Sequence, residues 1–229
     1  LSKNKKNYKV NNMSRKLKLA LLAGGWGGER KISLKTGENI FASLDKKKYK
    51  IFIYDPKDNL KKFFTDALDK KFDLVFPALY GPFGEDGRLQ GMLDLIGVPY
   101  LFSGTLASAL AMDKEKAKII AKSEGLDTAL YIILKRGEKY NLNSIIKKLS
   151  LPIFIKPASL GSSVGMSMAK TKKELEKGIK TAFRHDFKII LEKFIKGREL
   201  TVALFGNPPK ALPVIEIIPK ISEWFDYKA

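Results

Sequence analysis

Residues 18–28 read KLALLAGGWGG, and this stretch decides how the chain begins to fold. The apolar run at 18–23 is compatible with a buried β-strand, and the glycines that follow it break the strand into a tight turn. Apolar residues then recur at helical spacing between positions 34 and 44, and Ser33 is placed to cap that helix. The stretch therefore predicts a strand, a glycine turn and a helix.

The same alternation continues along the next part of the chain. A strand is predicted at 49–54, a helix at about 61–68 and a strand at 74–77. This β-α-β-α-β order implies a parallel sheet with right-handed crossovers. Helices at about 89–96 and 105–112, with a short strand at 98–101 between them, complete this first block.

A second block of mixed elements follows. Helices are predicted at 114–124 and 142–149 and where Leu175, Ile179, Ala182 and Phe183 share one face, and strands are predicted at 130–134, 153–156, 166–169 and 188–192. Residues 200–205 and 212–218 alternate like antiparallel strands around the turn Asn207-Pro208-Pro209. The fold class expected from both blocks is α/β.

Composition excludes several classes of protein. The chain has 229 residues, 45% of them apolar, so it can bury a sizeable core. No window approaches the roughly 18 uninterrupted apolar residues of a membrane-spanning helix, and the start of the chain lacks the apolar stretch of a secretory signal. We therefore expect a soluble, cytoplasmic protein with no membrane partner. With no cysteine and a single histidine, disulfide frameworks and thiolate metal sites are excluded, and Ser-His-Asp catalysis is poorly supplied.

The formal net charge of +19 would ordinarily suggest a polyanionic partner. Most of the excess is lysine in short clusters between apolar positions, and no aromatic residues interleave with them in an RNA-binding pattern. The better interpretation is a solvated surface with local phosphate affinity and no nucleic-acid partner.

Both ends of the chain look cut. It begins with Leu1, and Met13 is the better candidate for a true start. It stops at Ala229, directly after the run Trp224-Phe225-Asp226-Tyr227, without the polar fade-out typical of a natural terminus. The interpretation is a C-terminally truncated chain whose residues 1–16 form a basic tail, and such a fragment is expected to be inactive by itself.

Two glycine-rich turns are candidate ligand loops. The turn at 24–28 is followed by Glu29-Arg30 at the carboxyl end of a parallel strand, where open α/β sheets place ligands, but it is as compatible with a plain βα turn. The loop at 160–165, Leu-Gly-Ser-Ser-Val-Gly, can form an anion-binding nest, with Lys156 supplying a positive charge from the preceding strand. It lacks a P-loop ending, so a flexible lid over nucleotide phosphates is the favoured interpretation, and a glycine-rich hairpin without a ligand is the alternative.

The segment Glu192-Lys193-Phe194-Ile195 followed by Gly197-Arg198-Glu199 places carboxylates around an apolar pair at a strand end. It can serve an adenosine, with main-chain groups at the adenine edge and a carboxylate on the ribose hydroxyls. These residues are also typical of a surface turn. The single His185 lies at a helix end, where it complements the helix dipole.

Several separated segments together resemble the D-alanine–D-alanine ligase family of the ATP-grasp superfamily. They occupy residues 23–34, 76–91 (FPALYGPFGEDGRLQG), 103–114, 154–165, 192–199 and 225–229. The resemblance covers about 18–229 and keeps the order of the segments. It implies an N-terminal Rossmann-like domain at 17–112, an ATP-grasp lid subdomain of α+β type at 113–198, and the start of a C-terminal ATP-grasp subdomain at 199–229.

The resemblance also implies a reaction. ATP would phosphorylate the carboxylate of one D-alanine, and the amine of a second would attack the acylphosphate to give a dipeptide for peptidoglycan. The implied cofactors are ATP and two Mg²⁺ or Mn²⁺ ions, the implied substrate is D-alanine, and a homodimer is expected. D-lactate or D-serine as the second substrate, and a non-catalytic nucleotide-binding module, remain alternatives.

Site residues follow from the resemblance position by position. The implied catalytic and substrate-binding residues are Glu29, for the ammonium group of the first D-alanine, Ser162 in the same network, and Tyr80, which stands where the family usually has His. The implied ATP-binding residues are Lys114 and Lys156 with Ser162 and Ser163 at the phosphates, Glu192, Lys193, Phe194 and Ile195 at adenine, and Glu199 at ribose. Lys31 stands where a Glu often occurs, and the metal ligands of the family are expected beyond Ala229.

Overall fold

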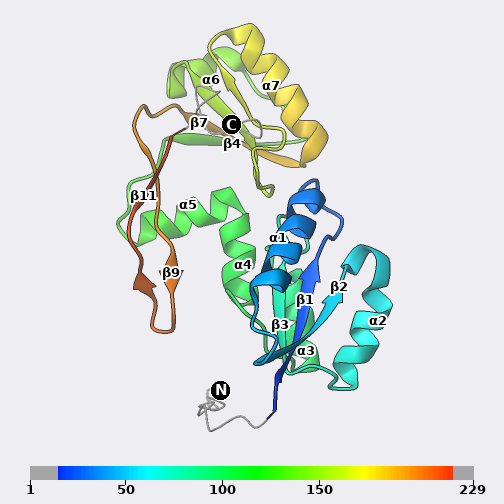
Figure 1. The fold of residues 1–229 in the computed structure, drawn as a ribbon. Helices are drawn as coiled ribbons and strands as arrows, with labels where there is room; N and C mark the ends of the chain where they lie inside the picture. The colour runs from blue at the N-terminus through cyan, green and yellow to red at the C-terminus, as the bar shows by residue number, and fades with distance from the viewer. Residues whose placement is uncertain (1–14, 219–229) are drawn as a thin grey trace. The chain divides into compact units, whose positions relative to one another are not determined.

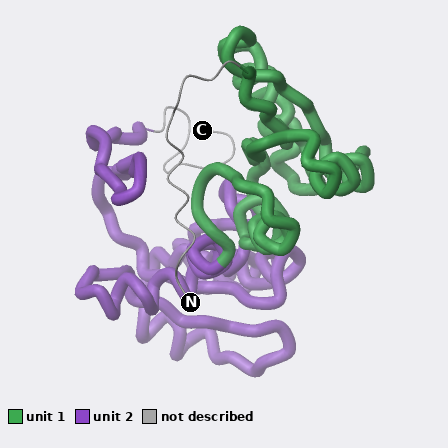
Figure 2. The backbone as a smooth tube through the Cα atoms, turned by 90° about the horizontal axis from the view of Figure 1, so that it is seen from below, with its two compact units in different colours: residues 1–105 green, residues 106–229 purple. Residues whose placement is uncertain are grey.

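The structure is a computed structural model that describes residues 15–218. It divides into two compact units between Thr105 and Leu106 (Figure 2). The expected tail, apart from its last two residues, and the closing segment at 225–229 lie outside the described residues. The domain boundary at 112/113 implied by the family resemblance stays a prediction. Between residues 15 and 218, no helix is both long and apolar enough to cross a membrane.

The first unit confirms the predicted β-α-β-α-β order (Figure 1). Its three strands are parallel in the order β2-β1-β3, and Leu19 of the central strand pairs with Ile51 on one side and Leu74 on the other. The short strand predicted at 98–101 is reduced to one parallel bridge, between Val75 and Tyr100. The elements are β1 (Leu17–Ala23), α1 (Arg30–Ser43), β2 (Tyr49–Tyr54), α2 (Pro56–Leu68), β3 (Leu74–Ala78) and α3 (Arg88–Ile96).

Strand β1 is buried on both of its faces, as a central parallel strand between helices should be. One face packs into a cluster shared with α2 and α3, whose members include Ala20, Leu22, Phe63 and Leu93. The other face meets α1, where Gly37 lies so close to Ala23 that a Cβ added at residue 37 would be 2.5 Å from the Ala23 Cβ. This double burial explains why the strand reads as a continuous apolar run.

Two predicted helix starts are wrong. Helix α1 begins at Arg30, so Ser33 lies inside the helix and is buried instead of capping it. Helix α2 begins at Pro56, five residues before its predicted start, because Asp55 caps it by accepting a hydrogen bond from the Lys57 backbone and because proline suits the first helical position. Non-helical dihedral angles at Asn59 interrupt α2. The first turn is therefore out of phase with the apolar spacing of the rest of the helix, from which the start was predicted.

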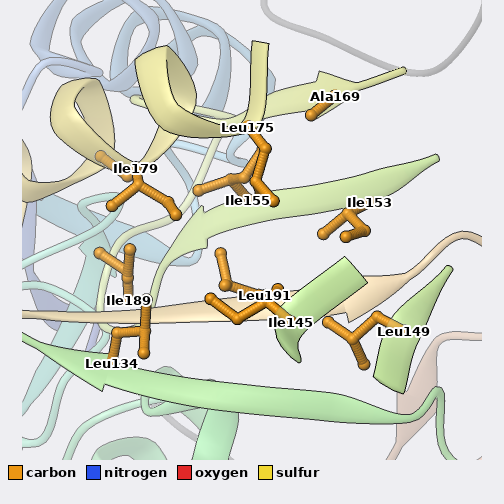
Figure 3. Packing of buried hydrophobic residues seen from close by; sticks show 11 residues of the cluster. Leu134, Ile145, Leu149, Ile153, Ile155, Ala169, Leu175, Ile179, Ile189 and Leu191 are labelled. Atoms are coloured by element: carbon orange, nitrogen blue, oxygen red, sulfur yellow. The ribbon is translucent and has the colours of Figure 1, made fainter. Parts of the chain in front are cut away.

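The second unit contains a four-stranded antiparallel sheet in the order β4-β7-β5-β6. One face of this sheet is covered by α6 and α7 over a core in which Ile153, Ile155, Leu175, Ile179 and Leu191 are fully buried (Figure 3). The elements in this unit are β4 (Tyr131–Lys135), α6 (Leu142–Leu149), β5 (Ile153–Pro157), β6 (Ser167–Ala169), α7 (Lys172–His185) and β7 (Lys188–Lys193); α4 (Thr105–Met112) and α5 (Lys114–Ser123) precede them in the chain.

The predicted pair of antiparallel strands near residue 210 is present in a broken form. Strand β8 (Glu199–Thr201) pairs with β11 (Ile215–Ile217), and β9 (Leu204–Phe205) pairs with β10 (Lys210–Ala211). The turn between β9 and β10 contains the predicted Asn207-Pro208-Pro209 sequence. The strand expected at 200–205 is thus divided into β8 and β9, whereas the strand expected at 212–218 is reduced to β11, because β10 lies just before that range.

Candidate functional site

Strands β5 and β7 build one part of the site because side chains alternate between the two faces of a sheet. Ile153 and Ile155 point into the core beneath α7, so Phe154 and Lys156 face the opposite side. In β7, Leu191 faces the core and Glu192 therefore also faces the opposite side. The sheet thus places Lys156 and Glu192 together on the face that α6 and α7 do not cover.

Glu192 is a buried carboxylate held by two lysines. The Nζ of Lys156 is 2.5 Å from one carboxylate oxygen, and the Nζ of Lys118 is 2.9 Å from the other. Only 8% of the Glu192 side chain is exposed. Burial by itself would raise the pKa of the Glu192 carboxyl, but Lys156 and Lys118 outweigh that effect and lower the pKa below its ordinary value.

Helix α5 brings Lys118 to the sheet and is anchored there by its first turn. Asp113 caps the helix by accepting hydrogen bonds from the Glu115 and Lys116 backbones. Lys188 of β7 pairs with Asp113 at 2.6 Å and with Glu115 at 2.7 Å. The Lys114 N–H also donates to the Ala158 carbonyl, at 2.9 Å, just after β5.

Lys114 is the third lysine of this group. Burial, and then the positive charge of Lys156, lower the pKa of the Lys114 ammonium group. Its Nζ donates to the carbonyl of Leu160, at the start of the predicted lid. Three ammonium groups therefore gather around one buried carboxylate, and the negative charges of Asp113 and Asp186 also act on Lys114.

The glycine/serine loop after β5 has an unusual backbone. Ser162 and Ser163 have φ values of +48° and +57°, and Gly165 has +70°. Two consecutive serines in the left-handed region are uncommon, and such conformations cluster at ligand-binding segments. The loop is closed by hydrogen bonds from Val164 N–H to the Gly161 carbonyl and from Met166 N–H to the Ser163 carbonyl.

The segment after Glu192 continues from the same strand end. The Lys193 N–H donates to the Leu130 carbonyl and the Phe194 N–H donates to the Pro152 carbonyl, so both amides are engaged within the unit. The Phe194 ring packs 5.7 Å from the Phe154 ring, measured between centroids. Ile195 is exposed, and Glu199 is an exposed residue that opens β8.

A second group of polar residues lies at the carboxyl ends of β1 and β3 in the first unit. Glu29, at the N-cap of α1, is buried with 8% exposure. A Cβ added at Gly81 would lie 2.5 Å from a Glu29 carboxylate oxygen, so the Gly81 backbone approaches this side chain closely. The Gly81 N–H donates to Glu85 at 2.6 Å. Burial, reinforced by the negative charge of Glu29, raises the pKa of the Glu85 carboxyl.

The glycine turn beside Glu29 is fixed by side chains on both of its flanks. The Ser33 hydroxyl accepts from the Gly24 N–H at 2.8 Å and donates to the Ala78 carbonyl, which ties the end of β1 to the end of β3. Asp55 accepts from the Gly25 N–H at 2.8 Å and pairs with Arg30. These contacts define the position from which α1 begins.

The chain matches two family models. One describes the N-terminus of D-Ala–D-Ala ligase and matches residues 54–103, and the other describes its C-terminus and matches residues 120–229. A D-alanine–D-alanine ligase of Syntrophobacter fumaroxidans is 41% identical over 216 residues, which cover 93% of this chain and 69% of that protein. The chain belongs to the D-alanine–D-alanine ligase family. It is therefore a ligase with the α/β architecture and ATP-grasp fold of that family.

Solved structures of D-Ala–D-Ala ligases agree with this fold. A Bacillus anthracis D-alanine–D-alanine ligase complexed with ATP superposes with a TM-score of 0.79 at 33% identity, covering 90% of this chain and 68% of that chain. A D-Ala:D-Ser ligase of Enterococcus faecalis superposes with a TM-score of 0.76 at 30% identity, covering 93% of this chain and 73% of that chain. The names of these two proteins specify different second substrates, although both superpose on this chain.

The residues predicted from the D-Ala–D-Ala ligase resemblance fall into two groups. Lys114, Lys156, Ser162, Ser163, Glu192, Lys193, Phe194, Ile195 and Glu199 belong to the second unit, whereas Glu29 and Tyr80 belong to the first. In the second unit, the structure brings Lys156 into contact with Glu192 and Lys114 into contact with the start of the loop. In the first unit, the Tyr80 hydroxyl is 3.1 Å from the Thr36 hydroxyl.

Sequence reasoning missed Lys118 and Glu85. Lys118 follows Lys114 by four residues, so both occupy one face of α5, and that spacing was the available signal. Glu85 was visible only as part of the matched segment. Lys118 acquires its significance from its ion pair with Glu192, and Glu85 from its proximity to Glu29; both carboxylates are far away in the chain.

The metal ions implied by the family resemblance find no ligand set in this part of the chain. Within the described range, 15–218, no three His, Asp or Glu side chains gather closely enough to hold a metal ion. These residues therefore do not fit the expected pair of Mg²⁺ ions.

Proposed function

We propose that the full-length protein joins two D-alanine molecules at the expense of ATP, through an acylphosphate. The observation that carries the ATP site is the cluster of Lys114, Lys118 and Lys156 around the single buried carboxylate of Glu192. Three ammonium groups in one partly buried place suit a polyphosphate, because charge-assisted hydrogen bonds to phosphate are strong where water is scarce.

The neighbouring loop supports the same assignment. Ser162 and Ser163 place their backbone in the left-handed region, and the Leu160 carbonyl binds the Lys114 ammonium. Backbone amides turned outward in such loops form concave anion sites. We assign Ser163 and the loop to the phosphates, with Lys114 and Lys156 supplying the charges.

The adenosine would extend from Glu192 toward Glu199. The Lys193 and Phe194 amides already have partners, so the adenine edge would use other groups of this segment, including the Ile195 main chain. The exposed Ile195 side chain and the Phe154–Phe194 ring pair offer an apolar surface for a base. Glu199 would accept hydrogen bonds from the ribose hydroxyls.

D-Alanine is assigned to the carboxylates of the first unit. The buried carboxyl group of Glu29 is suited to an ammonium group, which can form charge-assisted hydrogen bonds to it. Tyr80 follows β3 in the same unit. Ser162 belongs to the second unit, and its role in binding the first D-alanine stays a prediction from the family resemblance. The cytoplasmic location and the homodimer both stay predictions.

The proposed reaction has two steps, phosphoryl transfer and then amide-bond formation. A carboxylate oxygen of the first D-alanine attacks the γ-phosphorus of ATP, and ADP leaves with the electrons of the broken P–O bond. The amine of the second D-alanine then attacks the acyl carbon, inorganic phosphate leaves, and the amine loses a proton. Such chemistry depends on positioning and on charge stabilisation, for which lysines and backbone amides are adequate protein groups.

A D-serine acceptor is the second candidate. The observation that favours it is the similarity to the Enterococcus faecalis D-Ala:D-Ser ligase. The same ATP site and first-substrate site would serve both reactions, and only the amine that attacks the acylphosphate would differ.

The test, on the full-length protein, is phosphate release from ATP in the presence of Mg²⁺ and D-alanine, with product mass measured when D-alanine, D-serine and D-lactate compete. D-Alanyl-D-alanine as the main product is expected, and L-alanine is the matched control that should give no release. A dominant D-alanyl-D-serine product would transfer the assignment to the second candidate. ATP binding without any ligation product would support a non-catalytic nucleotide-binding module instead.

A further inference from the structure

The two oxygens of the Glu192 carboxylate have separate lysine partners on separate elements. Lys156 reaches one oxygen from β5, and Lys118 reaches the other from α5. The Lys118 side chain is only 16% exposed, and its ammonium lies 5.6 Å from the centroid of the Tyr131 ring. Lys118 is therefore enclosed between a carboxylate and an aromatic face, unlike the solvated lysines of this chain.

Glu192 creates a conflict for the proposed nucleotide site. If Lys156 is to bind a phosphate, its ammonium must turn away, at least in part, from the carboxylate that now holds it. A buried carboxylate left without a partner is strongly destabilising. Without a second cation, Glu192 would therefore retain Lys156 and oppose phosphate binding.

We propose that Lys118 is a positioning residue of the nucleotide site, which holds Glu192 so that Lys156 is available to a phosphate group. This inference rests on the proposed ATP-dependent function. Lys118 acts through Glu192 and Lys156 and does not itself contact the nucleotide. Its own position is independent of Lys156, because α5 is fastened to β7 by the pairs of Lys188 with Asp113 and Glu115.

The experiment compares Lys118→Met with Lys122→Met, a matched control on the same helix at an exposed position. ATP affinity is measured by titration calorimetry, and the KM values for ATP and D-alanine are measured in the phosphate-release assay. Lys118→Met should weaken ATP binding about tenfold and leave the D-alanine KM within about twofold, because only the phosphate site loses an available charge. Lys118→Arg should restore ATP affinity to within about twofold, and Lys122→Met should change neither value.

A Glu192→Gln background separates this role from direct binding. In that background no carboxylate retains Lys156, so adding Lys118→Met should weaken ATP binding much less than it does in the wild-type background. An equal loss in both backgrounds would mean that Lys118 contacts the nucleotide directly and would overturn the proposal. Should Lys118→Met fail to fold, Lys118→Gln removes the charge while keeping a hydrogen-bond donor for Glu192, and the same comparison applies.

Two failures are distinguishable. If the wild-type protein binds no ATP, the proposed function itself is wrong. If the wild type binds ATP and Lys118→Met binds it equally well, the proposed function stands and the role of Lys118 is refuted.

Discussion

Lys156 and Glu192 lie diagonally across two neighbouring antiparallel strands, with the Lys156 Nζ 2.5 Å from a Glu192 carboxylate oxygen. The register pairs Lys156 with Ile190 and Phe154 with Glu192, so the two charged side chains meet on one face of the sheet. The lysine assigned to an ATP phosphate is therefore positioned by the sheet and by a carboxylate of the same unit.

Lys156→Ala should raise the KM for ATP and lower kcat. The phosphate would lose a charge-assisted hydrogen bond worth about 1.5–3 kcal/mol, which corresponds to roughly ten- to a hundredfold. Steady-state kinetics with varied ATP measures the change. Lys147→Ala, at an exposed position on α6, removes the same charge and should have no effect. Unchanged ATP KM and kcat in Lys156→Ala would remove this residue from the site.

Glu29→Gln should raise the KM for D-alanine far more than the KM for ATP, because an ammonium group would lose its ionic partner while the second unit keeps its lysines. A rise of about tenfold or more is expected from the loss of one buried charge pair. Glu38→Gln, an exposed position on the same helix, is the matched control. If ATP affinity were the property that fell, Glu29 would have to be reassigned to the nucleotide.

Glu85 should make the stability of the protein depend on pH. In the folded chain, mainly desolvation raises the pKa of the Glu85 carboxyl above its ordinary value of about 4.5. The unfolded chain therefore releases this proton at lower pH than the folded chain does. The free energy of unfolding contributed by Glu85 therefore falls as pH rises above about 4.5 and levels off above the folded pKa.

Glu85→Gln has no proton to release and keeps an acceptor for the Gly81 N–H. Relative to the wild type, this variant should become more stable as pH rises through that window. Urea unfolding of both proteins at a series of pH values measures the difference. A difference that stays constant from pH 4 to pH 7 would contradict the raised pKa of this carboxyl.

Gly37→Ala should destabilise the first unit. In a helix interior alanine is ordinarily preferred to glycine by about 1 kcal/mol, but here the added Cβ would meet the Ala23 Cβ at 2.5 Å. Overpacking of this kind costs about 1–3 kcal/mol, so the net effect should be a loss. Thermal unfolding measures it. Gly28→Ala is the control, because nothing lies within 4 Å of a Cβ added there, and a loss of equal size in that variant would refute the steric reason.

Local patterns predicted most of the elements correctly. The strand at 18–23 and the helices at 89–96 and 142–149 depend on apolar spacing and turn residues that lie within the segments themselves. Ser33 shows where such reasoning fails. Its hydroxyl was expected to cap a helix, but it joins Gly24 to Ala78, and that second partner is 45 residues away. A cap assigned from sequence ignores competing partners that only folding brings near.

The sequence by itself determined the family and the order of strands and helices, because long matched segments and hydrophobic periodicity are properties of the chain read in order. It also indicated Lys114, Lys156 and Glu192 as site residues. Only the tertiary structure decided that Lys118 holds the second oxygen of Glu192 and that Glu85 lies where partial desolvation and the charge of Glu29 raise its pKa. Charge pairing and desolvation act through space, and their magnitude depends on the distances and burial that strand register and helix anchoring create.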